Sequence, residues 1–126
     1  MIIKQLSVFL QNELGRLEEA TDVIYKNNIN ITALSIAETA EYGILRMIVS
    51  DTDKAAEALK ECDFSIKITD VICIEVPDNS GELHKILRKL SDNGINLSYM
   101  YGYSKSGKAP LILKVSDPKK AIEVLE

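Results

Sequence analysis

The sequence predicts an α+β fold made of two tandem βαββαβ units, in which the helices of each unit lie on one face of an antiparallel sheet. Three observations carry this prediction. The chain repeats itself at a fixed spacing, both copies show the same order of strand-like and helix-like patterns, and the expected helices begin and end at suitable residues. We place the first repeat at residues 1–69 and the second at residues 70–126.

The repeat appears when the chain is shifted along itself by 66 residues, without a gap. The identical pairs include Gly15 and Gly81, Leu17 and Leu83, Asn27 and Asn93, Ile29-Asn30 and Ile95-Asn96, and Val49-Ser50-Asp51 and Val115-Ser116-Asp117. Such a match indicates an internal duplication. A unit of about 60 residues buries little surface by itself, so we expect the two copies to share a sheet.

The first half of each copy predicts a strand, a loop and a helix. The strands are expected at residues 5–10 and 71–76, where apolar side chains alternate, and the loops end in Gly15 or Gly81. The helices that follow have apolar residues every three or four positions, namely Leu17, Ala20 and Ile24 in the first copy and Leu83, Ile86, Leu87 and Leu90 in the second. Asn27-Asn28 and Asn93-Gly94 are residues that tolerate the backbone conformation at which helices end.

The second half of each copy predicts two strands and a second helix. The strands are expected at residues 29–36 and 43–50 and again at 95–103 and 110–116. Asp51 and Asp117 follow as expected N-caps of the helices, with Pro118 in the first turn of the last one.

The two copies end differently. A fourth strand at residues 65–68 closes the first copy, whereas the second copy ends at Glu126, inside its second helix, and so has no last strand of its own. Either the chain is truncated, or the other copy or a second molecule covers this edge. Because an open strand edge promotes association, we expect it to be covered. Residues 65–76 carry apolar side chains of one parity and are expected to run as one strand between the copies.

In each copy, the residues around the glycine-containing loop and the first helix resemble the ACT domain. This domain is a small amino-acid-sensing module of amino-acid metabolism. The family pattern, Asp-x-x-Gly-x-Leu before a helix and Gly-Ile-Asn-Ile before the next strand, is matched in the second copy by Asp78, Gly81, Leu83, Gly94, Ile95 and Asn96. In the first copy it is matched by Asn12, Gly15, Leu17, Ile29, Asn30 and Ile31, with Asn12 in place of the aspartate and Asn28 in place of the glycine. The resemblance covers both copies. It implies a ferredoxin-like fold and an amino acid bound at an interface between two such units.

The residues themselves support a site at the glycine-containing loops. A helix N-terminus attracts an anion such as an α-carboxylate, glycine lets a ligand approach the backbone, and an Asp or Asn can accept hydrogen bonds from an α-ammonium. The candidate ligand-binding residues are Asn12, Leu14, Gly15, Arg16, Asn30, Asp78, Ser80, Gly81 and Asn96. Arg16 is suited to attract a carboxylate, but which of the two loops binds stays open. Alternatively, the glycines only form tight turns, Asp78 is an N-cap, and the asparagines satisfy local backbone.

Composition narrows the class of function. With a net charge of −4 and a pI near 5.1, neither nucleic acid nor an anionic membrane is an expected partner. Cys62 and Cys73 have no metal-like spacing and indicate reduced thiols of a cytoplasmic protein. We expect no metal and no cofactor.

Three other patterns have simpler explanations than catalysis or nucleotide binding. Residues 102–109 begin like a phosphate-binding loop, but Ala109 stands where a Ser or Thr is needed, so we interpret them as a hairpin loop. Tyr99, Tyr101 and Tyr103 alternate and indicate a sheet face that packs against another layer or subunit. His84, the single histidine, lies off the apolar side of its helix and is expected in solvent.

The sequence as a whole predicts a sensor rather than an enzyme, because no constellation of paired titratable groups is present. We expect a small regulatory protein that binds a free amino acid at the interface of its two repeats, forms a homodimer and acts on a partner enzyme of amino-acid metabolism. The alternative is an interaction module that docks onto a partner enzyme, or onto itself, without a ligand.

Overall fold

The computed structural model describes residues 1–11, 13–38 and 41–126. Its elements along the chain are β1 (Ile2–Gln11), α1 (Arg16–Lys26), β2 (Ile31–Glu38), β3 (Tyr42–Val49), α2 (Thr52–Glu61), β4 (Ser65–Pro77), α3 (Glu82–Asp92), β5 (Leu97–Gly102), β6 (Lys108–Val115) and α4 (Pro118–Leu125). This order is one predicted βαββαβ pattern followed by a second copy that shares β4 and ends after α4.

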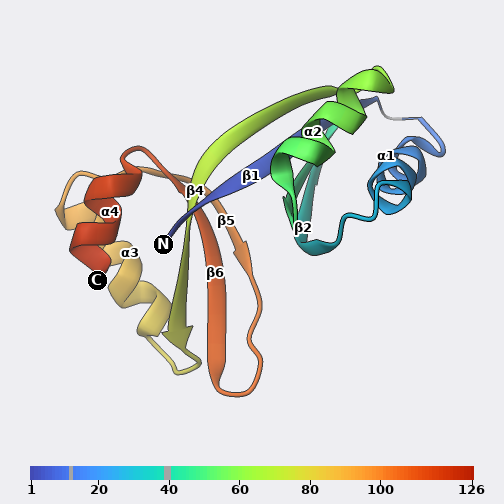
Figure 1. Ribbon diagram of the computed structural model, residues 1–126. Helices are drawn as coiled ribbons and strands as arrows, with labels where there is room; N and C mark the ends of the chain where they lie inside the picture. The colour runs from blue at the N-terminus through green and yellow to red at the C-terminus, as the bar shows by residue number, and fades with distance from the viewer. Residues whose placement is uncertain (12, 39–40) are drawn as a thin grey trace. The chain divides into compact units, whose positions relative to one another are not determined.

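The chain divides into two compact units (Figure 1). The first unit is Lys4–Thr69 and carries α1 and α2; the second unit combines Met1–Ile3 with Asp70–Glu126 and carries α3 and α4. Neighbouring strands follow the order β2-β3-β1-β4 in the first unit and β1-β4-β6-β5 in the second. The predicted fold class is confirmed.

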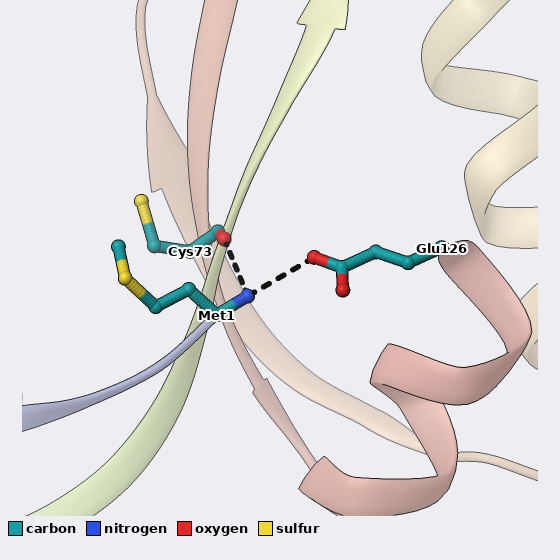
Figure 2. Close-up of polar contacts among 3 residues, drawn as sticks. All are labelled: Met1, Cys73 and Glu126. Carbon is teal, nitrogen blue, oxygen red and sulfur yellow. Dashed lines mark hydrogen bonds and ion pairs between the residues drawn. The ribbon is translucent and has the colours of Figure 1, made fainter.

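The first residues of the chain supply the last strand of the second unit. The Cys73 N–H donates to the Met1 carbonyl at 2.8 Å, and the Met1 amino group donates to the Cys73 carbonyl at 3.3 Å, as neighbouring antiparallel residues do. The same amino group lies 3.3 Å from a carboxylate oxygen of Glu126. Figure 2 draws both contacts of this amino group. The strand that the second repeat lacks in sequence is therefore provided from the other end of the chain.

Strand β4 belongs to both units. Its residues up to Thr69 complete the first unit and those from Asp70 begin the second, so the expected continuous strand between the repeats is confirmed. In Figure 1 it is the long strand that changes from green to olive.

Each unit has its own apolar core between the helices and one sheet face. In the first unit, Leu6 pairs with Met47 and Val8 with Leu45, which places all four on the same face. The core residues that are at most 1% exposed there are Leu6, Val8, Ala20, Ile24, Leu45, Met47, Ala55 and Leu59. The corresponding set in the second unit is Ile72, Leu90, Leu113, Val115 and Ala121. The helices thus cover one face of each sheet, as predicted.

The helix ends follow the sequence signals. The side chains of Asp51 and Asp117 each accept a hydrogen bond, at 3.1 Å, from the backbone three residues later, as N-caps do. Asn28 and Gly94 have φ values of 57° and 69° just after the ends of α1 and α3. None of the helices in the described part of the chain is long and apolar enough to cross a membrane.

Two leucines predicted on the apolar sides of their helices differ from that expectation. Leu17 and Leu83 remain 40% and 39% exposed. Both lie in the first helical turn, beside the glycine-containing loop, whereas the buried residues of these helices lie further along, at Ala20 and Ile24 in α1 and at Leu90 in α3. In the first unit the exposed side chain of Leu17 lines a pocket instead.

Candidate functional site

A pocket of about 240 Å³ opens in the first unit, where β1 ends and α1 begins. Strand pairing explains why it also involves β2 and β3: Gly43, at the start of β3, pairs with Leu10 of β1 and with Glu38 of β2. The lining residues are Leu10, Gln11, Glu13, Arg16, Leu17, Ile36, Glu38 and Gly43. The volume lies below the roughly 300–1,000 Å³ of pockets for drug-sized ligands and suits a smaller molecule.

The pocket depends on the missing side chain of Gly43. Its φ is not in the left-handed region, so backbone conformation does not require glycine here. A Cβ atom at this position would lie 4.0 Å from the Leu10 Cβ and from the Ala37 carbonyl oxygen, which is ordinary van der Waals contact. A larger residue would therefore fit the strand while taking space from the pocket.

Arg16 is the cation of this pocket, and part of its guanidinium is unused. Nη1 forms an ion pair with Glu19, and the guanidinium carbon lies 4.3 Å above the centre of the Phe64 ring. The side chain is 24% exposed, and its Nε is buried without a hydrogen-bond partner among the residues that the structure describes. A buried donor without a partner is rare and costly, so this N–H remains available to an acceptor.

The chemistry of the unused edge points to a carboxylate. The N–H groups on Nε and Nη2 point to the same side of a guanidinium and can bind both oxygens of a carboxylate at once. Arg16 is also the first residue of α1, where the helix dipole favours a negative charge. Gly15 is the N-cap, and no side chain caps this end of the helix.

Two carboxylates complete the polar part of the lining. Glu13 precedes α1 and Glu38 ends β2, and both side chains are exposed. Neither has a hydrogen-bond or ion-pair partner within the described ranges of the chain. The pocket thus offers one cationic edge, two free carboxylates and an apolar floor from Leu10, Leu17 and Ile36.

The same place in the second unit has different chemistry. At the spacing of 66 residues, Glu82 takes the place of Arg16, Asn79 that of Glu13 and Ser104 that of Glu38. Glu82 is paired with Lys85 at 3.1 Å. The loop before α3 is tied to the neighbouring hairpin, because the Asp78 N–H donates to the Gly107 carbonyl at 2.9 Å.

A second pocket, of about 400 Å³, lies at the opposite end of the second unit's first helix. Its lining residues are Leu87, Leu90, Ser91, Gly94, Ile95, Asn96 and Leu97. No charged side chain lines it, so a zwitterion would lose its water there without gaining an ion pair. We therefore take the smaller pocket as the candidate site.

Of the site residues predicted from sequence, the structure places Arg16 in the lining of the candidate pocket. Gly15 adjoins it, with the φ of +88° that only glycine adopts easily. The side chain of Leu14 is fully exposed and is not part of the lining. Asn12 lies outside the described residues.

The predicted residues of the second loop, Asp78, Ser80 and Gly81, lie together before α3 and are exposed. Gly81 itself is the N-cap of α3, with φ +86°, and no side chain caps that helix, so the reading of Asp78 as an N-cap is wrong.

Asn30 and Asn96 do not join the glycine-containing loops. Each follows the end of a helix whose other end carries Gly15 or Gly81, about 16 Å away for eleven residues. The Asn30 N–H donates to the Ser50 hydroxyl at 2.9 Å, and Asn96 makes the same bond to Ser116 at 3.0 Å. These backbone contacts close the sheet beside the second helix of each unit.

Sequence reasoning missed Glu13, Glu38 and Gly43. The signal was available in the predicted topology: if β1 pairs with β3, the end of β1 must meet the hairpin between β2 and β3. The duplication drew attention to positions that the repeats share, whereas these three residues differ between the repeats.

A clear shift is found at Lys26, whose pKa is raised by its hydrogen bond to Asp22 and by the charge of that carboxylate. This pair lies at the exposed end of α1. The described residues contain no group of three His, Cys, Asp or Glu side chains placed to hold a metal ion.

Comparison with known proteins agrees with this architecture. A family model described as an ACT domain pair matches residues 1–126. The chain belongs to the ACT domain pair family. The pair is a regulatory fold, and the resemblance seen in the sequence is confirmed.

Several solved structures share the fold of this ACT domain pair. Protein BT0572 from Bacteroides thetaiotaomicron is 50% identical, with a TM-score of 0.94 over 99% of this chain and 87% of that one. The regulatory subunit of aspartate kinase from Thermus thermophilus, in a ligand-free form, is 9% identical, with a TM-score of 0.70 over 99% and 93%. The same subunit from Thermus flavus is 10% identical and also has a TM-score of 0.70, over 99% and 93%. At these identities the two kinase subunits share the fold alone. No curated protein is a significant match.

Proposed function

We propose that this ACT domain pair is a sensor that binds a free amino acid in the pocket of its first unit. The unused Nε–Nη2 edge of Arg16 carries the proposal, because it is a ready carboxylate site beside a helix N-terminus. The free carboxylates of Glu13 and Glu38 are suited to the α-ammonium group. A ligand of about ten heavy atoms at roughly 0.6–0.8 kcal/mol each would reach micromolar affinity.

The proposal differs in location from the expectation based on the sequence. That expectation put the ligand at the interface of the two repeats. We favour the pocket within the first unit because all of its lining residues belong to Lys4–Thr69. Both locations use the loop before α1.

The first test is the melting temperature of the full chain with each of the 20 amino acids in turn. A ligand at about 100 times its dissociation constant should add roughly 2.7 kcal/mol and raise the melting temperature by several degrees. One or a few responders are expected. If no amino acid raises the melting temperature at millimolar concentration, the sensor function is wrong.

Two variants then locate the site. Arg16→Lys keeps the charge but removes Nε and the two-pronged donor, and is expected to weaken binding about tenfold or more. Arg88→Lys is the matched control, since Arg88 is an exposed arginine on α3 outside the pocket. Gly43→Val fills the pocket on a strand that accepts a β-branched residue, and should abolish the response without loss of stability.

We further propose that the sensor acts through a partner enzyme of amino-acid metabolism, in the cytoplasm, as a homodimer. Structural neighbours that are regulatory subunits of aspartate kinase support the partner, and the two free cysteines suit a reducing compartment. The exposed apolar side chains of Leu34 and Ile36, on β2 at the edge of its sheet, support self-association.

These exposed side chains also favour a second function, that of a ligand-independent interaction module. Sedimentation of the full chain with and without its responding amino acid separates the two. If the amino acid that raises the melting temperature also changes the fraction of dimer, the sensor is supported. If no amino acid changes the melting temperature and the dimer still forms, the interaction module is supported. Leu34→Thr, at an exposed residue that does not line the pocket, should weaken the dimer in either case.

A further inference from the structure

We infer that the pocket of the first unit selects an amino acid with a cationic side chain. This inference rests on the proposed function and adds the ligand class to it. The observation behind it is the balance of charge in the lining. Glu13 and Glu38 oppose the single cation Arg16, and Arg16 is already paired with Glu19.

The charges of the ligand can be matched to these groups one by one. The α-carboxylate is matched by the guanidinium of the lining residue Arg16, whose Nε has no partner among the described residues. The α-ammonium pairs with one of the two carboxylates. With a neutral amino acid the second carboxylate stays unpaired, whereas a second ammonium on the side chain would pair with it.

The apolar part of the lining fits the same ligand. Leu10, Leu17 and Ile36 offer surface for a chain of methylene groups between the two charged ends. An acidic side chain would instead meet two carboxylates of its own sign. The lining therefore favours a long side chain that ends in a positive charge.

The second unit indicates that these charges are particular to this pocket. Asn79 and Ser104 stand at the positions of Glu13 and Glu38, and neither carries a charge. The carboxylates are thus not part of what both repeats need to fold. Their two positions are free to vary while the fold stays the same.

The test compares L-lysine with L-norleucine, which has the same side chain without the terminal ammonium. Calorimetry on the full chain should show lysine binding up to about fivefold more tightly, the usual upper effect of one partly exposed ion pair. Glu13→Gln and Glu38→Gln should each reduce this preference for lysine. Glu57→Gln is the control, because Glu57 is an exposed residue of α2 in the same unit and does not line the pocket.

The outcomes separate the inference from the function. If norleucine, leucine or glutamate binds as tightly as lysine, and Arg16→Lys weakens that binding, the charge selection is wrong and the sensor function stands. If lysine is preferred but Glu13→Gln and Glu38→Gln leave the preference unchanged, the selection does not come from these carboxylates and the inference is also wrong. If no amino acid binds, both are wrong.

Discussion

The two units have the same order of elements but differ in what each needs to be complete. Lys4–Thr69 contains all four of its strands in one stretch of chain, whereas the second unit takes its last strand from Met1–Ile3. They differ again at the loop before the first helix, where the first unit has Arg16 and the second has Glu82. The comparison teaches that the duplication preserved the scaffold while the strand ends and loops diverged.

The largest effect on stability is expected when the chain is cut between the two repeats. Residues 1–69 retain every strand of the first unit, but residues 70–126 lose Met1–Ile3, so the Cys73 N–H and carbonyl lose their partners on Met1. We expect the first fragment to unfold cooperatively and the second to be unfolded, since a unit of this size has only about 3–5 kcal/mol to lose. Thermal melting followed by circular dichroism measures both.

A repaired fragment provides the control. Adding residues 1–4 after Glu126 through a short glycine linker should restore cooperative melting, because the Met1 amino group lies 3.3 Å from the Glu126 carboxylate. A linker followed by a scrambled tetrapeptide should not. Cooperative melting of residues 70–126 alone would show that the borrowed strand is dispensable.

Replacing the glycine before the first helix is expected to lower the free energy of unfolding by the same amount in both units. Gly15 and Gly81 have φ values of +88° and +86°, and a Cβ atom at either would meet nothing within 4 Å. The cost of Gly15→Ala and of Gly81→Ala should therefore come from backbone conformation alone, about 1–2 kcal/mol each. Urea unfolding of both variants measures it, and Gly43→Ala, at an ordinary φ, should instead be neutral or stabilising by up to about 1 kcal/mol. A much larger cost at one of the two glycines would mean that the loops are not equivalent.

A smaller matched effect is expected at the N-caps of α2 and α4. Asp51→Ala and Asp117→Ala each remove an acceptor 3.1 Å from a backbone N–H, at a cost of about 1 kcal/mol. Asp51→Asn and Asp117→Asn keep an acceptor and should cost less than the alanine variants. Equal losses for Asn and Ala in urea unfolding would argue that the cap hydrogen bond does not contribute.

Much of this comparison could be predicted from the sequence, because local patterns determine it. The caps at Asp51 and Asp117, the helix ends at Asn28 and Gly94 and the long strand from Ser65 all rest on neighbouring residues. These were predicted and are confirmed.

The borrowed strand and the pocket could not be read in the same way. Met1–Ile3 pairs with residues about 70 positions away, and a short apolar stretch at a chain terminus does not reveal its partner. Glu13, Glu38 and Gly43 form one lining only after β1, β2 and β3 are aligned. The family resemblance directed attention to Asp78 and Asn96, whereas the unused donor is on Arg16.

The smallest effect on stability should come from exchanging the members of a charge pair that the two repeats carry in opposite order. Asp22 and Lys26 lie 2.9 Å apart on α1, and the same positions on α3 hold Arg88 and Asp92 at 3.8 Å. Lys26 ends its helix, where the dipole favours a cation, whereas Asp92 puts an anion at the corresponding end. Exchanging the pair in the first unit (Asp22→Arg with Lys26→Asp) should lower the melting temperature slightly, and Arg88→Asp with Asp92→Lys in the second should raise it.

Salt and pH distinguish this electrostatic cause from a change in helix propensity. Both shifts should shrink at 1 M salt, which screens exposed charges. The pKa of Lys26 is raised in the folded state, so the stability that it contributes is fully present below its ordinary pKa of 10.5 and is lost as the pH rises through the higher folded value. The exchanged first unit should therefore differ from the original chain at pH 7 and approach it as the pH rises past 10.5. If the changes in melting temperature persist at high salt, they come from helix propensity. The opposite order of the charges would then have no effect on stability.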